Sequence, residues 1–204
     1  MPKLKPSILA REFKSLDKTM YHGTNSRHYQ SLFSGVSLRE CKNKTDFGRG
    51  FYLTTKFIQA SKHANNRSKF NGDAIVFVYD VDVAALRQFQ EKIFRKMDRE
   101  WAEFIYLNRS ERVIMDHHGF DYVFGGVADG KIEDLIEELD EINVTPNSPE
   151  FDYFYESIAK YDTYDQLSIH NQEIFDYNII TLRKVVRAFN KNSVYEYDAS
   201  QITL

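Results

Sequence analysis

Strand-like and helix-like segments alternate along this chain, and that alternation restricts its fold more than any other feature. The clearest strand pattern is "DAIVFVYDVD" at residues 73–82, which is rich in β-branched and aromatic side chains. It follows "KFIQASKHANNRSKF" at residues 56–70, whose apolar spacing predicts a helix that Thr55 caps and that ends near Gly72. A fold with both kinds of element is therefore expected.

The rest of the chain continues the pattern. Helices are predicted at residues 26–36, 98–109 and 131–142, and strands at 19–24, 51–54, 120–129 (ending in a glycine turn), 165–169 and 179–189. The segment "NSPEFDYFYESIAKYDTY" at residues 147–164 has two interpretations, a helix with flanking loops or a lid. The predicted class is α+β, with helices inserted between strands.

Composition sets the broad limits. A chain of 204 residues with 42% hydrophobic side chains can bury one core, so we expect a single domain over residues 19–204 after an N-terminal lead-in of residues 1–18. The single Cys41 excludes an intramolecular disulfide and favours a cytoplasmic location. No apolar run reaches the roughly 18 residues that a membrane helix needs, so no membrane partner is expected.

Three short motifs look suited to binding a ligand. They are "YHGT" at residues 21–24, "GRGFYLTT" at residues 48–55 and "YDQLSI" at residues 164–169. Glycine lets a backbone pass close to a ligand, and strand alternation places Tyr52 on the side opposite to its two apolar neighbours.

In this order the motifs resemble those of the His-Tyr-Glu branch of the ADP-ribosyltransferase superfamily, which includes diphtheria toxin and the poly(ADP-ribose) polymerases. The likeness covers Thr19 to Phe189, and "DFGRGFYLTTKFIQASKHA" and "FDYVFGGVADGKI" are similar to a prokaryotic family of uncharacterised domains in that superfamily, several of them in toxin or phage-defence loci. The resemblance implies a split β-sandwich with inserted helices around an NAD cleft. It also implies NAD as a substrate, whose bond to nicotinamide breaks through an oxocarbenium-like transition state.

The first two motifs carry the residues that the resemblance assigns to NAD. His22 matches the histidine that hydrogen-bonds a ribose hydroxyl, Gly23 matches the glycine whose backbone holds the carboxamide, and Thr24 lies beside it in the cofactor-binding motif. Tyr52 matches the tyrosine that stacks on the nicotinamide ring. The structural alternatives are a histidine at a strand end, an ordinary glycine turn and an aromatic side chain of the core.

The glycine loop would then run beside the dinucleotide. Gly48 and Gly50 would permit the close approach, and Arg49 would meet the pyrophosphate with its guanidinium. A solvated cation in an ordinary loop is the equal alternative for Arg49.

The third motif departs from the family pattern, because Gln166 stands where the catalytic glutamate is expected. A glutamine can hydrogen-bond a ribose hydroxyl but carries no negative charge and cannot act as a base. We therefore expect transfer of a single ADP-ribose and no chain elongation. A carboxylate could come from Asp165, Glu173 or Asp46, each of which is otherwise a surface carboxylate.

The resemblance predicts a mono-ADP-ribosyltransferase that acts as a toxin or defence effector on a macromolecule. The acceptor would be RNA, DNA or protein, and a cognate antitoxin or inhibitor protein is an expected partner. A nucleic acid is slightly favoured, because aromatic side chains could stack bases and basic ones could contact phosphates. The aromatic set is Phe151, Tyr153, Phe154, Tyr155, Tyr161 and Tyr164, and the basic set is Arg183, Lys184, Arg187 and Lys191. A packed insertion and a half-exposed strand explain both sets equally well.

Two other functions stay open. Gln166 favours a module that binds NAD, ADP-ribose or nucleic acid without chemistry. If water were the acceptor of ADP-ribose, the chain would be an NAD glycohydrolase.

The segment "FGGVADGKI", with Gly125, Gly126 and Asp129, either lines the cleft or is a plain turn. No metal site is expected, since the pair His117-His118 has no third ligand at metal spacing.

Overall fold

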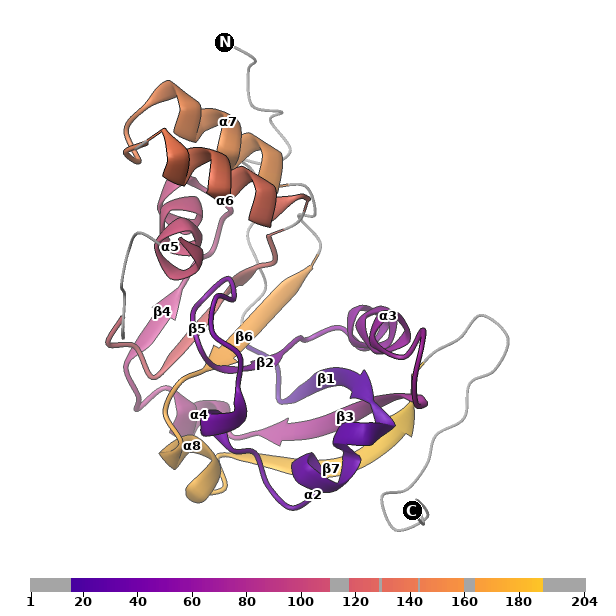
Figure 1. The fold of residues 1–204 in the computed structure, drawn as a ribbon. Coiled ribbons are helices and arrows are strands. Elements are labelled where there is room, and N and C mark those ends of the chain that lie inside the picture. The colour runs from indigo at the N-terminus through magenta and orange to yellow at the C-terminus, as the bar shows by residue number, and fades with distance from the viewer. Residues whose placement is uncertain (1–15, 111–117, 129, 143, 160–163, 189–204) are drawn as a thin grey trace. The chain divides into compact units, whose positions relative to one another are not determined.

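The computed structural model describes residues 16–110, 118–128, 130–142, 144–159 and 164–188. The architecture is mixed α+β, with two sheets and several helices, which confirms the predicted class (Figure 1). The chain divides into two compact units. Unit 1 contains Cys41–Gly50 and Gln90–His170, and unit 2 contains Leu16–Glu40, Phe51–Phe89 and the chain from Asn171 onward. The single domain over residues 19–204 stays a prediction.

Unit 2 is built on an antiparallel sheet. Its strand order is β1 (Thr19–Asn25), β3 (Ala74–Val81), β7 (Ile180–Arg187). The short strand β2 (Phe51–Leu53) leads to Thr54, which bridges to Tyr21 of β1. The smaller elements are the 3-10 turns η1 (Ser26–His28) and η2 (Leu38–Glu40) and the helices α2 (Tyr29–Phe33), α4 (Val83–Leu86) and α8 (Glu173–Asp176).

Both faces of this sheet are covered. Helix α3 (Phe57–Arg67) places Ala60 and Ala64 against Val76 and Val78 of β3. Because side chains alternate along a strand, Phe77 of β3 faces the other way, where it meets Tyr29 of α2. The predicted helix and the predicted strand are thus joined by an apolar layer, which holds β1 and its histidine in place.

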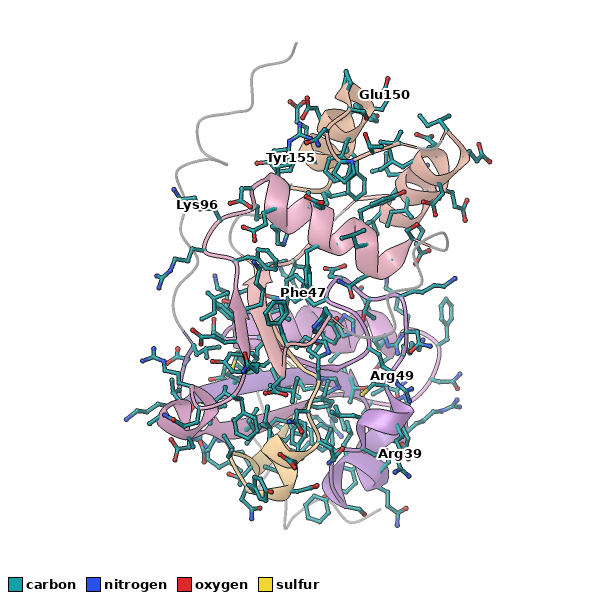
Figure 2. All side chains as sticks on the ribbon, turned by 90° about the vertical axis from the view of Figure 1, so that its left-hand side faces the viewer. Arg39, Phe47, Arg49, Lys96, Glu150 and Tyr155 are labelled. Carbon is teal, nitrogen blue, oxygen red and sulfur yellow. The ribbon has the colours of Figure 1, made fainter. Side chains whose placement is uncertain are left out.

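Unit 1 combines three helices with neighbouring strands. β4 (Glu91–Ile93) pairs in parallel with β5 (Tyr122–Gly126), and β5 pairs antiparallel with β6 (Asp165–Ile169). The helices α5 (Arg99–Arg109), α6 (Ile132–Glu141) and α7 (Pro149–Ile158) pack against one another. Phe47, labelled in Figure 2, is fully buried among Phe94 and Phe104 and so fixes the preceding residue, Asp46, in this unit.

The aromatic segment at residues 147–164 forms a packed helix, α7, so the helix interpretation is confirmed over its described part. Ser148 caps the helix and Pro149 follows in the first turn, a usual way for a helix to begin. Phe151, Phe154 and Tyr155 are buried, whereas Tyr153 is exposed. The buried rings contribute to the core of unit 1.

Some predicted boundaries are wrong. Lys56, and not Thr55, occupies the N-cap position of α3, and its side chain makes no capping hydrogen bond. The same helix ends at Arg67, five residues before Gly72. Gly125 and Gly126 continue strand β5 instead of forming a turn, since both pair with β6. The short elements β4 and α4 were not expected. Within the described ranges, no helix is long and apolar enough to cross a bilayer.

Candidate functional site

In unit 2, the ring of His22 is held by the backbone of β2. Its Nδ1 lies 2.7 Å from the carbonyl oxygen of Tyr52, and a carbonyl can only accept, so Nδ1 must carry the hydrogen. Burial lowers the pKa of His22 from 6.5 to about 4, and the ring is therefore neutral near pH 7. In this tautomer Nε2 is a hydrogen-bond acceptor, and no described residue bonds to it.

The aromatic neighbours of this histidine follow the predicted alternation. Phe51 and Leu53 are buried, and Tyr52 between them is partly exposed. The ring of Phe51 stacks on that of His22, with centroids 4.5 Å apart and planes 27° apart. The core side of β2 thus supports the histidine, while Tyr52 is the member of the strand that a ligand could reach.

Gly23 has a packing reason to be glycine. A Cβ atom there would lie only 1.9 Å from the carbonyl oxygen of Ala60, because α3 lies directly against β1. Thr24, the next residue, is buried. The assignment of both residues to NAD stays a prediction.

The loop with two glycines is shaped by its own unit. Gly48 has a positive φ of +82°, and a Cβ on Gly50 would lie 2.4 Å from the hydroxyl oxygen of Ser168 on β6. Arg49 between them is exposed (Figure 2), and its carbonyl oxygen lies 2.8 Å from Nδ1 of His170. The left-handed backbone of Gly48 and the tight packing of Gly50 within unit 1 therefore account for both glycines, and a role of this loop toward the dinucleotide stays a prediction.

Gln166 lies on β6 and is almost completely buried, with 8% of its surface exposed. Its side-chain nitrogen donates to Oδ2 of Asp46 at 2.8 Å and to the carbonyl oxygen of Gly126 at 3.0 Å. Because both neighbours are acceptors, the nitrogen and not the oxygen of the amide must face them. Oε1 therefore points to the opposite side, where no donor among the described residues reaches it.

Asp46 is a buried carboxylate, which corrects the expectation of a surface position. Its Oδ1 accepts from Nε and Nη2 of Arg109, both at 2.8 Å, and its Oδ2 also accepts from the backbone N–H of Ala128 at 3.1 Å. A carboxylate buried to this degree requires such partners. We call Asp46, Arg109 and Gln166, with their backbone partners Gly126 and Ala128, the Asp46 network.

Two further carboxylates were expected at the surface. Glu173 is exposed, whereas Asp165 is buried, which corrects the expectation for Asp165. The segment "FGGVADGKI" contributes backbone groups of Gly126 and Ala128 to the Asp46 network, and its Asp129 lies outside the described residues. No local signal in the sequence pointed to Arg109, because it ends an ordinary amphipathic helix.

A pocket of about 610 Å³ adjoins Arg109 in unit 1. Its lining is rich in carboxylates: Lys44, Arg109, Glu133, Ile136, Glu137, Asp140 and Glu141. Such a surface repels phosphate, so this pocket does not suit the pyrophosphate of a dinucleotide. Among the described residues, no three His, Cys, Asp or Glu side chains could hold a metal ion, and His117 lies outside them.

Fold and site together define an α+β protein with one neutral histidine acceptor and one oriented glutamine acceptor. Residues 18–179, which contain all three motifs and the whole Asp46 network, match a family described as proteins of unknown function, DUF3990. The chain belongs to this family. No curated protein and no solved structure matches this chain.

Proposed function

We propose that this chain is a mono-ADP-ribosyltransferase that releases nicotinamide from NAD and transfers the ADP-ribose to a macromolecule. The proposal includes an ADP-ribosyltransferase-like fold around an NAD cleft. The observation that carries it is the state of His22: a neutral ring whose Nδ1 is bound to Tyr52 and whose Nε2 accepts hydrogen bonds. A ribose hydroxyl is the complementary donor.

The oriented amide of Gln166 supports the same chemistry. Its Oε1 is an acceptor of fixed direction, so each unit carries one acceptor of the kind that a sugar hydroxyl needs. The neutral state of His22 matters as well, because an imidazolium would oppose the positive charge that develops on the ribose. Tyr52 is proposed to stack on nicotinamide and Arg49 to bind the pyrophosphate.

The structure changes the argument about which macromolecule accepts the ADP-ribose. Phe151, Phe154 and Tyr155 are buried in α7, so they do not present a base-stacking surface. On β7, Arg183 lies 3.3 Å from Asp80, and Lys191 is outside the described residues. Tyr153 is exposed, Tyr164 is partly exposed, and Tyr161 lies outside the described residues. The aromatic support for a nucleic acid is therefore weaker than the sequence suggested, and the proposed acceptor of ADP-ribose is a macromolecule, either nucleic acid or protein. A toxin or defence role in the cytoplasm, with an inhibitor partner, stays an expectation from the resemblance.

The test is transfer of label from NAD carrying radioactive phosphate to separate pools of cell protein, RNA and DNA. We expect one pool to become labelled by the wild type, and His22→Ala and Tyr52→Ala to abolish the labelling while their circular dichroism spectra stay unchanged. His28→Ala and Tyr177→Ala are matched controls, because both side chains are exposed.

The alternatives give different results in the same assay. Free ADP-ribose with no labelled macromolecule would identify an NAD glycohydrolase. Binding of NAD without consumption would identify a binding module, and full activity of His22→Ala would contradict the assigned site.

A further inference from the structure

We infer that Asp46 is the positioning residue for Gln166 and supplies the negative charge that position 166 lacks. The inference rests on the proposed function and adds a residue to its site. All of the contacts that carry it lie within unit 1: Gln166 on β6, Asp46 in the loop after Cys41, and Arg109 at the end of α5.

The contacts of Gln166 leave one orientation for its amide. Both amide hydrogens are used, by Asp46 at 2.8 Å and by the carbonyl of Gly126 at 3.0 Å. Turning the amide over would place its oxygen against two other acceptors and lose both hydrogen bonds. Oε1 is thereby kept available for a hydroxyl donor.

The charge of Asp46 also acts through the amide. An N–H that donates to a carboxylate shifts electron density toward the oxygen of the same amide, so Oε1 becomes a stronger acceptor than in a free glutamine. In an oxocarbenium-like reaction this effect would place partial negative charge near the sugar without placing a carboxylate there. Glutamine at position 166 is then a functional part of the site.

Asp46 is itself held from three directions. Arg109 binds only Oδ1, through two nitrogens, which leaves Oδ2 to Gln166 and to the N–H of Ala128. The turn closed by the N–H of Gly48 on the carbonyl of Thr45, at 3.0 Å, presents the carboxylate. These contacts fix both the place and the direction of the charge.

The same geometry explains why a glutamate would be unfavourable at position 166. Its carboxylate would lie at hydrogen-bond distance from that of Asp46 and would face the carbonyl of Gly126. Two carboxylates this close cannot both be ionised. The pair therefore keeps one proton, which the two groups share. We therefore expect Gln166→Glu to reduce nicotinamide release, and not to restore a family-like glutamate.

The first test does not depend on NAD turnover. In Gln166→Glu protein labelled with ¹³C at the side-chain carboxyls of Asp and Glu, NMR titration should show a carboxyl group that stays protonated well above pH 5. The double variant Asp46→Asn with Gln166→Glu should lose this feature, and the exposed control Gln30→Glu should titrate in the usual range. Ordinary titration of Gln166→Glu would overturn the inference.

The second test measures nicotinamide release. Asp46→Asn should lower kcat by about 10- to 100-fold with little change in the KM for NAD, since the charge acts on the transition state. The double variant, which exchanges carboxylate and amide, should recover part of the kcat lost in Gln166→Glu. An unchanged kcat in Asp46→Asn would overturn the inference about Asp46 but not the proposed function. A wild type that releases no nicotinamide, beside the expected titration, would instead overturn the proposed function and leave the contact between the two side chains established.

Discussion

At the scale of single residues, the protonation state of His22 is the property that matters most. The sequence pointed to His22 as a candidate site residue but not to its tautomer. The carbonyl that binds Nδ1 belongs to Tyr52, thirty residues away in the chain. Burial then lowers the pKa of the ring to about 4. The result is an acceptor that keeps its state across the physiological pH range.

This state has a consequence for stability. Between pH 6.5 and about 4, His22 is protonated in the unfolded chain and neutral in the folded chain. The contribution of His22 to the free energy of unfolding is therefore fully present above pH 6.5 and is lost as the pH falls toward 4. On lowering the pH from 7 to 5, the wild type should lose about 2 kcal/mol more unfolding free energy than His22→Asn. Urea unfolding at the two pH values measures this difference. Asn66→Ala, at an exposed position of α3, should behave like the wild type, and equal losses in wild type and His22→Asn would refute the assignment.

The Asp46 network shows why part of the site could not be predicted. The sequence offered Asp46 as one of three carboxylates, and nothing local distinguished it, because its partner Gln166 is 120 residues away. Arg109 looked like the last residue of an ordinary helix. Hydrogen bonds between distant segments depend on how the strands pair, and periodicity does not contain that information.

At the scale of elements, side-chain patterns predicted well which helices and strands exist, but predicted less well where each begins and ends. β3 follows from its run of β-branched and aromatic residues, which is buried along most of its length, and α5 follows from its helical spacing, which buries one apolar face. The start of α3 did not follow, because its N-cap is Lys56, whose side chain makes no capping hydrogen bond and which is not a residue type that favours this position. The short strand β4 has only three residues, too few for a period to be recognised.

The contact between β1 and α3 gives a prediction for Gly23. In Gly23→Ala the new methyl group would meet the carbonyl of Ala60 at 1.9 Å, and a backbone atom cannot move aside without shifting the helix. We expect the unfolding free energy to fall by at least about 2 kcal/mol. Asn66→Ala, at an exposed position of α3, should change it by less than about 0.5 kcal/mol. Denaturant unfolding measures both, and a Gly23→Ala protein as stable as the wild type would show that α3 does not lie this close.

At the scale of the whole molecule, the chain builds two units from interleaved segments. Cys41–Gly50 belongs to unit 1 although the segments on both sides of it belong to unit 2. Phe47 anchors this segment in the core of unit 1, and Phe77 has the corresponding position in the core of unit 2. Separate cores permit separate opening of the units.

Hydrogen exchange tests this division. Phe47→Ala should increase exchange mainly in α5, β5 and β6, and Phe77→Ala mainly in β1, β3 and β7, because each removes a fully buried ring from one core. Each variant is the control for the other. A uniform increase over both units in either variant would mean that the molecule opens as one cooperative body.

The central claim is that this protein breaks the bond between nicotinamide and ribose in NAD. The most direct measurement is the release of nicotinamide from NAD labelled in that ring, in the presence of cell extract. The account predicts release by the wild type and by His28→Ala, and at least a 100-fold loss, on the order expected for removing a hydrogen bond to the transition state, in His22→Ala. No release by the wild type, or equal release by His22→Ala, would contradict it.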